Sequence, residues 1–118
     1  APRPHNSGHL TIEGCETSQY EQHIRCIFDF PLGNSKIYND IVMMNVVGPP
    51  KIKGEFELIN IDKILKTSSM SFHFYGKKVS KPNRKLGHIT MKGGEKDKIL
   101  NELKKVKSTL KIIEETWK

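Results

Sequence analysis

Two separate stretches of this 118-residue sequence carry side chains that can bind an anion. The first is the opening run APRPHNSGH, in which Arg3, His5 and Asn6 offer hydrogen-bond donors among prolines that fix the backbone φ angle. The second is YGKKVSKPNRKLGHITMKGG, residues 75–94, which holds six basic side chains and no carboxylate. Rigid donors suit a small planar anion, and lysine and arginine both bind phosphate well.

The charge distribution leaves the kind of anion open. The chain has 20 Lys and Arg against 13 Asp and Glu, and no acidic residue lies between positions 62 and 95. A solvated loop that aids solubility explains the lysines but not the missing carboxylates. Nucleic-acid binding could use Phe72 and Phe74 as stacking surfaces, although two phenylalanines on one face are more often core. The third interpretation is a pocket for one phosphate, bracketed by Lys77 and Arg84.

Other site chemistries find less support in the sequence. No nucleophile-elbow, zinc-protease or Walker-type motif occurs, and no catalytic residue is predicted. A metal site from His5, His9 and Cys15 is disfavoured because their spacing fits no zinc pattern, so no metal ligand is predicted. Capping or packing is a reasonable role for His9, His23 and His73 and a less suitable one for His5.

Cysteine usage and hydropathy indicate a reducing, aqueous setting. Cys15 and Cys26 match no paired metal or redox spacing, and the sequence has no Asn-x-Ser/Thr sequon, so we predict a cytoplasmic protein. No apolar run approaches the roughly 18 residues that a membrane-spanning helix needs, and no membrane partner is expected.

Helices and strands that could position these residues can be predicted in order. The opening run is predicted to be a loop. A capping signal at Thr17 or Ser18 predicts a helix that ends near Phe30. Its apolar stripe consists of Tyr20, Ile24, Ile27 and Phe28. Residues 41–47 are apolar on both faces, which is typical of a buried strand, and residues 53–59 are predicted to form a second strand.

The second half of the chain continues this alternation. Residues 60–68 are predicted to form a short helix capped by Asn60. Alternating apolar and polar residues in 69–75 and, more briefly, in 88–92 predict two half-buried strands that flank the basic loop. A long helix is predicted from Glu95. Its apolar stripe consists of Ile99, Leu103, Val106, Leu110, Ile113 and Trp117.

Two long motifs resemble one enzyme family. The run APRPHNSGHLTIEGCETSQYEQHIRCI resembles the end of the ATP-grasp domain of 5-(carboxyamino)imidazole ribonucleotide synthases, the ATPase component of phosphoribosylaminoimidazole carboxylase. The run HFYGKKVSKPNRKLGHITMKG resembles the C-terminal signature of the same family. The likeness covers residues 1–94 in register. It implies an α+β fold, in which residues 1–33 end an ATP-grasp domain and residues 34–118 form a small β-rich C-terminal domain with a closing helix.

The resemblance also implies a reaction. Family members are ATP-dependent ligases of de novo purine biosynthesis that carboxylate the amine of 5-aminoimidazole ribonucleotide with bicarbonate. The family's residues near the bicarbonate and the amine fall on Arg3, His5 and Asn6, and those near the ribonucleotide phosphate fall on Lys77 and Arg84. Three further lysines are expected to add a longer-range field. They are Lys78, Lys81 and Lys85.

Further expectations follow from the same resemblance. ATP and Mg²⁺ are the implied cofactors, and the segments that bind them are expected upstream of this chain, so the chain alone is expected to be inactive. A homodimer of the full-length enzyme and functional coupling to a mutase or carboxylase component also fit. Where relatives often carry Arg-Pro-Gly-Arg-Lys, this chain has KPNRK, and Asn83 can adopt left-handed backbone angles much as glycine does.

One alternative from another class remains. The chain could be a stand-alone basic module that binds RNA or single-stranded DNA, whereas the family interpretation expects no nucleic-acid partner. Salt dependence separates the two, because binding through many backbone phosphates weakens steeply as ionic strength rises.

Overall fold

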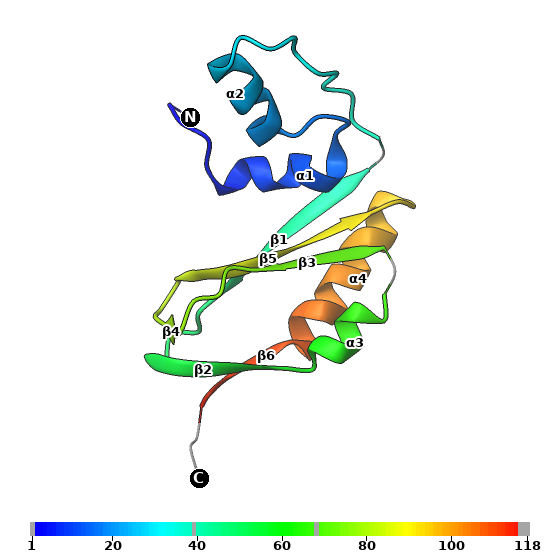
Figure 1. Ribbon diagram of the computed structural model, residues 1–118. Helices are drawn as coiled ribbons and strands as arrows, with labels where there is room; N and C mark the ends of the chain where they lie inside the picture. Colours follow the sequence, from blue (N-terminus) through cyan, green and yellow to red (C-terminus); the bar gives the residue numbers. More distant parts are fainter. Residues whose placement is uncertain (1, 39, 68, 116–118) are drawn as a thin grey trace.

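The computed structural model describes residues 2–38, 40–67 and 69–115, and its strands form two antiparallel sheets (Figure 1). The first sheet contains, in spatial order, β1 (Ile41–Val47), β5 (Lys85–Lys92) and β3 (Met70–Phe74). The second contains β4 (Val79–Ser80), β2 (Gly54–Ile59) and β6 (Lys111–Glu114). Helices α3 (Ile61–Leu65) and α4 (Lys96–Thr109) lie with the second sheet on one side of the first sheet (Figure 1).

The core lies between the first sheet and α4. Its buried apolar residues are Val46, Ile64, Leu86, Ile89, Met91, Ile99, Leu103 and Val106. Strand β5 is central, and six of its eight residues are buried because both of its faces are covered. Ile89 and Met91 pack in the core, whereas His88 and Thr90 alternate with them on the opposite face. A buried, polar layer therefore separates the sheet from the N-terminal segment.

The N-terminal segment covers that opposite face with three short helices. They are η1 (Asn6–His9), a 3₁₀ helix, and the α-helices α1 (Leu10–Gly14) and α2 (Gln19–Ile27). The predicted loop in the opening run is therefore wrong from Asn6 onward. Ser18 caps α2 as predicted, since its Oγ accepts a hydrogen bond from the Glu21 amide at 3.1 Å. The helix ends earlier than expected, because Asp29 has a φ of 53°.

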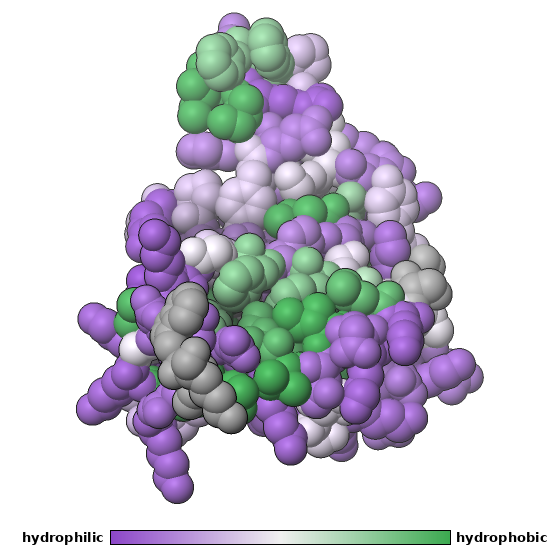
Figure 2. Space-filling view, turned by 60° about the horizontal axis from the view of Figure 1, so that its bottom comes forward, coloured by the Kyte–Doolittle hydropathy of each residue, from purple (hydrophilic) through white to green (hydrophobic). Residues whose placement is uncertain are grey.

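The apolar stripe of α2 does not lie in a core. Ile24, Ile27 and Phe28 are exposed, and no residue of this helix is buried. In Figure 2, hydrophobic side chains gather at the distant upper end of the molecule, over α2 and the segment that follows it.

The predicted strands at 41–47 and 53–59 correspond closely to β1 and β2. The long C-terminal helix, in contrast, is wrong beyond Thr109, where the chain turns at Leu110 into β6 and pairs with β2. The hydroxyls of Ser108 and Thr109 both donate to the Lys105 carbonyl, a pattern that weakens a helix end. Ile113 therefore belongs to a strand, and Trp117 lies outside the described residues.

Asn60 occupies the first position before α3 as predicted, with a left-handed φ of 69°, but its side chain makes no cap. It donates instead to the Thr109 carbonyl at 2.9 Å, which connects the start of α3 to the end of α4. In the described part of the chain, no helix has the length and hydropathy to span a membrane.

Candidate anion-binding site

The N-terminal donor segment is a tight turn packed against α2. The Ser7 amide donates to His5 Nδ1 at 3.3 Å, so the His5 ring caps η1, a role that the sequence made less expected for this histidine. The Tyr20 hydroxyl donates to the His5 carbonyl at 2.6 Å. Gly8 lies close to α2, because a Cβ there would lie 1.9 Å from Gln19 Oε1 and would displace that side chain.

Asn6 connects this segment to the first sheet. Its Nδ2 donates to Asn45 Oδ1 on β1 at 2.6 Å, and its Oδ1 accepts a hydrogen bond from Lys85 Nζ at the start of β5. Both ends of the amide are therefore fixed by protein groups. Lys85 makes a direct contact here, beyond the long-range field expected of it.

The basic loop contains a β-turn that rests on Gly48. The Arg84 amide donates to the Lys81 carbonyl at 3.0 Å, and Asn83 has a left-handed φ of 60°, which confirms the conformation anticipated for it. The Asn83 amide donates to the Gly48 carbonyl at 3.0 Å, and the Gly48 amide donates to the Arg84 carbonyl at 2.8 Å. Just before the turn, β4 pairs with β2, so the stretch is not wholly a loop as predicted.

Arg84 partly serves its own loop. Its Nη1 donates to the Val79 carbonyl at 3.0 Å, while a guanidinium offers five N–H donors in all. Lys77 and Arg3 are exposed, and the described residues provide neither a hydrogen bond nor an ion pair to either side chain. The structure thus brings Asn6 to the base of the basic loop but records no contact that joins Arg3 to Lys77.

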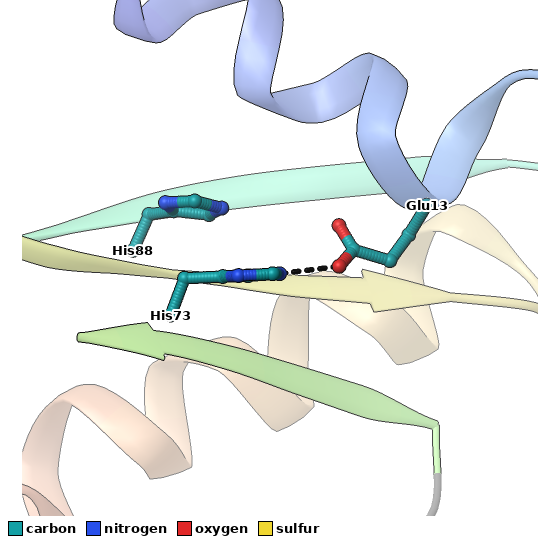
Figure 3. A group of neighbouring side chains, drawn as sticks. All are labelled: Glu13, His73 and His88. Atoms are coloured by element: carbon teal, nitrogen blue, oxygen red, sulfur yellow. Dashed lines mark hydrogen bonds and ion pairs between the residues drawn. The ribbon is translucent and has the colours of Figure 1, made fainter. Parts of the chain in front are cut away.

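A cluster of three side chains lies between α1 and the first sheet (Figure 3). His73 on β3 is directly opposite His88 on β5, and their rings stack with centroids 4.4 Å apart at 15°. Glu13 of α1 accepts a hydrogen bond from His73 Nε2. The sequence pattern indicates at most a capping or packing role for His73 and gives no sign of Glu13 or His88, because it does not contain the pairing register of the two strands.

This cluster offers one carboxylate and two imidazoles, with ligand atoms within 4.8 Å of one another. Such a donor set suits zinc in principle. The nearly parallel ring planes, however, direct the two imidazole lone pairs side by side rather than toward one point, and Glu13 already occupies Nε2 of His73. The geometry therefore favours a hydrogen-bonded cluster, at a place different from the His5, His9 and Cys15 set considered in the sequence.

Tyr75 extends the cluster toward η1. Its hydroxyl lies 2.9 Å from His9 Nδ1 and 2.8 Å from His88 Nδ1. Burial lowers the pKa of His88 to about 4, with further contributions from the nearby His73 and His9, and burial also lowers the pKa of His9. Burial raises the pKa of Tyr75. At neutral pH these three groups are therefore uncharged.

The phenylalanines proposed as stacking surfaces lie on the other face of β3. Phe72 packs against the core, and Phe74, which is 46% exposed, contacts Phe56 edge to face with ring centroids 6.2 Å apart. Side chains alternate along a strand, so both point away from the face that carries His73. These two phenylalanines therefore form no stacking surface beside the donor segment.

The fold and this surface define a small α+β protein in which a basic turn and a donor-rich helix meet at one end of an antiparallel sheet. The chain belongs to the phosphoribosylaminoimidazole carboxylase C-terminal domain family, whose pattern matches residues 41–102. The ATP-grasp domain family matches residues 1–20.

Named relatives agree with this assignment. The chain is 46% identical over 96 residues to phosphoribosylaminoimidazole carboxylase of Saccharomyces cerevisiae. The aligned region covers 77% of this chain and 16% of the yeast protein. It is 41% identical over 104 residues to N5-carboxyaminoimidazole ribonucleotide synthase of Bacillus subtilis, covering 87% of this chain and 26% of that protein. The chain therefore spans only a small part of the length of these relatives.

Solved structures show the same relationship. The crystal structure of N5-carboxyaminoimidazole ribonucleotide synthetase from Thermotoga maritima superposes with a TM-score of 0.89 at 44% identity, over 98% of this chain and 32% of that one. The synthase from Aspergillus clavatus, solved with ADP and 5-aminoimidazole ribonucleotide, gives a TM-score of 0.72 at 32% identity, over 92% of this chain and 29% of that one.

Proposed function

We propose that this chain is the C-terminal part of an ATP-dependent ligase that carboxylates the amine of 5-aminoimidazole ribonucleotide with bicarbonate in purine biosynthesis. The observation that carries the proposal is the contact between Asn6 and Lys85, which joins the donor segment to the base of the basic loop. These are the two regions that the family resemblance assigns to opposite ends of one substrate. The names of the Bacillus and Aspergillus relatives support the same reaction.

In this proposal the chain binds the ribonucleotide. Lys77 and Arg84 hold its phosphate, with Arg84 using donors that Val79 leaves free. Asn6, with its amide fixed at both ends, presents a preorganised dipole to the reacting amine and bicarbonate, and Arg3 supplies an exposed positive charge. His5, with its ring oriented by Ser7, binds or exchanges a proton there.

ATP and Mg²⁺ are assigned to other parts of the protein. Mg²⁺ prefers oxygen ligands in an octahedral arrangement, and the single cluster of potential ligands among the described residues contains two imidazoles. The residues present therefore do not fit the metal, and no step of the reaction is routed through them.

The finer points of the proposal rest on family likeness. They are bicarbonate as the carbon source, Mg²⁺ with ATP, a homodimer of the complete enzyme, coupling to a carboxylase or mutase component, and a cytoplasmic location. The name of the yeast relative, phosphoribosylaminoimidazole carboxylase, supports the coupling.

ADP release by the protein from the full reading frame tests the proposal. Release should require 5-aminoimidazole ribonucleotide and bicarbonate, and this chain alone should release none. Each charge-assisted phosphate contact contributes on the order of 1.5 to 3 kcal/mol, so Lys77→Ala and Arg84→Ala should each raise the KM for the ribonucleotide roughly tenfold or more.

The exposed Lys98 on α4 provides a matched control, since Lys98→Ala removes the same charge from a helix outside the basic loop. An unchanged KM in both loop variants would refute the assignment of the phosphate. Absence of ribonucleotide-dependent release, together with oligonucleotide binding that falls steeply with salt, would favour the nucleic-acid module instead.

A further inference from the structure

The helix η1 presents one side to the first sheet. It is a 3₁₀ helix of four residues, in which side chains three positions apart lie above one another. Asn6 and His9 have that spacing and point to the same side. Asn6 contacts Asn45 and Lys85, and His9 contacts Tyr75, so the polar contacts of this side reach all three strands of the first sheet or their ends.

Tyr75 stands between the two regions assigned to the substrate. It directly follows β3 and precedes Lys77 by two residues, so its backbone begins the basic loop. Its amide donates to the Leu86 carbonyl at 2.9 Å, which ties it to β5 just beyond Arg84. Its hydroxyl reaches back to His9 on η1. One side chain thus contacts the donor segment while its own backbone is fixed to the basic loop.

The chemistry of the Tyr75 hydroxyl makes this contact specific. His88 is 1% exposed and cannot exchange its partner for bulk water. With both imidazoles neutral, the hydroxyl can donate to one Nδ1 and accept from the Nδ1–H of the other. Phenylalanine would preserve the ring packing against His9 and His88 and remove both hydrogen bonds.

The pair of Glu13 and His73 belongs to the same group of stacked side chains between the N-terminal segment and the first sheet. His88 stacks on His73, which is bonded to Glu13 at the other end of the α1–η1 segment, and His9 stacks on His88 with centroids 4.5 Å apart. Besides the contact of Asn6 with Lys85, the N-terminal segment is therefore attached to β3 and β5 at two further points, through Glu13 and through His9. Of these two attachments, the one through His9 lies within one helical turn of Asn6.

We propose that Tyr75 is a positioning residue for the ribonucleotide site: its hydroxyl, between His9 and His88, fixes η1 and therefore Asn6 and His5 relative to the basic loop. This inference rests on the proposed function. Tyr75 acts through the residues it orients, and its loss should reduce the precision of the site while leaving the phosphate-binding cations in place.

The test compares Tyr75→Phe with Tyr38→Phe in the protein from the full reading frame. The Tyr38 side chain is exposed and makes no hydrogen bond among the described residues, so its variant removes a hydroxyl without touching the network. Tyr75→Phe should lower kcat/KM for the ribonucleotide about five- to tenfold, mainly through kcat, while the KM for ATP stays unchanged. Tyr38→Phe should behave as the wild type.

A double variant and hydrogen exchange make the test specific. If Tyr75 acts through His9, adding Tyr75→Phe to His9→Ala should change kcat/KM less than about twofold, whereas independent effects would multiply. Amide exchange in residues 5–9, which include the Gly8 amide bonded to the His5 carbonyl, should be faster in Tyr75→Phe than in Tyr38→Phe.

The outcomes separate this inference from the proposed function. Wild-type kinetics and unchanged exchange in Tyr75→Phe overturn the positioning role while the proposed function stands. Faster exchange with unchanged kinetics also overturns it, because the contact would then be structural only. If the wild type shows no ribonucleotide-dependent ADP release, the proposed function fails and the positioning role fails with it.

Discussion

At the scale of single residues, the basic turn depends on the missing side chain of Gly48. Its amide and carbonyl both bond to the turn, through the Arg84 carbonyl and the Asn83 amide. A Cβ at this position would lie 2.2 Å from the Lys81 carbonyl oxygen and 2.5 Å from Ser80 Oγ. Because Ser80 is fully buried, the turn cannot accommodate a Cβ without moving as a whole.

Gly48→Ala should therefore displace the turn that carries Arg84. We expect a loss of about 1 to 3 kcal/mol in the free energy of unfolding and a raised KM for the ribonucleotide. Urea unfolding of the 118-residue chain and kinetics of the complete protein measure the two effects. Asn83→Gly is the matched control, since glycine adopts a φ of 60° freely and adds no atom to the turn. Equal behaviour of the two variants would contradict this role of Gly48.

Burial of His88 makes the stability of the chain depend on pH. The folded pKa of about 4 lies below the ordinary value of 6.5, so the unfolded chain takes up a proton first as the pH falls. The stability contributed by the neutral ring is complete above about pH 6.5 and is lost as the pH falls through about 4. The full loss is on the order of 3 kcal/mol, and His9, whose pKa is also lowered, adds to it.

Urea midpoints measured between pH 4 and pH 8 test this dependence. The midpoint should be constant from pH 7 to 8 and fall below pH 6.5. His88→Asn should reduce this decrease of the urea midpoint at acidic pH. The exposed His23 provides the control, because His23→Gln should show the same decrease as the wild type. A wild-type midpoint that does not change between pH 4.5 and 7 would contradict the buried neutral state of His88.

At the scale of elements, the sequence predicted strands better than chain ends and connections. The apolar run at 41–47 and the segment 53–59 became β1 and β2, because local hydropathy suffices to locate strands. The burial expected for 41–47 was too deep, since Val46 is the one buried residue of β1. The apolar pattern typical of a helix continues past Thr109 in the sequence, but these residues pair with β2 instead. Strand pairing is a tertiary effect, and the periodicity of the sequence does not reveal it. The short η1 has too few residues for any periodic pattern.

In the candidate site, too, features set by local sequence could be predicted and features set by tertiary pairing could not. The left-handed turn at Asn83 could be predicted, because its angles depend on local residue chemistry. The pair of His73 and His88 could not, because it depends on which residues of β3 and β5 face each other. The contact of Asn6 with Lys85 spans 79 positions and likewise requires the assembled sheet.

Strand β6 can be distinguished from a continued helix by two neighbouring isoleucines. Ile112 packs against the core, whereas Ile113, which belongs to the apolar stripe of the predicted helix, is 40% exposed. Ile112→Ala should lower the free energy of unfolding by about 2 kcal/mol, and Ile113→Ala by less than about 1 kcal/mol. Urea unfolding of both variants measures the difference, and the reverse order would support a helix through Ile113.

At the scale of the whole molecule, the chain is less compact than its length suggests. Its radius of gyration is 16.3 Å, with extents of 54 × 33 × 22 Å, while a compact domain of this length would have about 13.5 Å. The N-terminal segment extends beyond the first sheet (Figure 1), and hydrophobic side chains gather at its far end (Figure 2). Its exposed large hydrophobic residues are Ile12, Ile24, Ile27, Phe28, Phe30, Leu32, Ile37 and Tyr38.

Exposed hydrophobic side chains that gather at one end of a molecule mark an interaction surface. Each named relative is several times longer than the aligned region, as in the Thermotoga structure, of which this chain covers 32%. We therefore expect the isolated chain to self-associate and to bind a hydrophobic dye, and the protein from the full reading frame to do so much less. Light scattering and dye fluorescence at equal molar concentration measure both properties.

One charged substitution should then act in opposite directions in the two proteins. Ile27→Asp should reduce self-association of the isolated chain, because Ile27 is exposed there, and should destabilise the complete protein, where the same side chain would be buried. Leu65→Asp is the control, since Leu65 is equally exposed but lies on α3, away from this surface. If Ile27→Asp leaves the thermal stability of the complete protein unchanged, α2 faces solvent there too. The apolar surface would then require a partner other than the rest of its own chain.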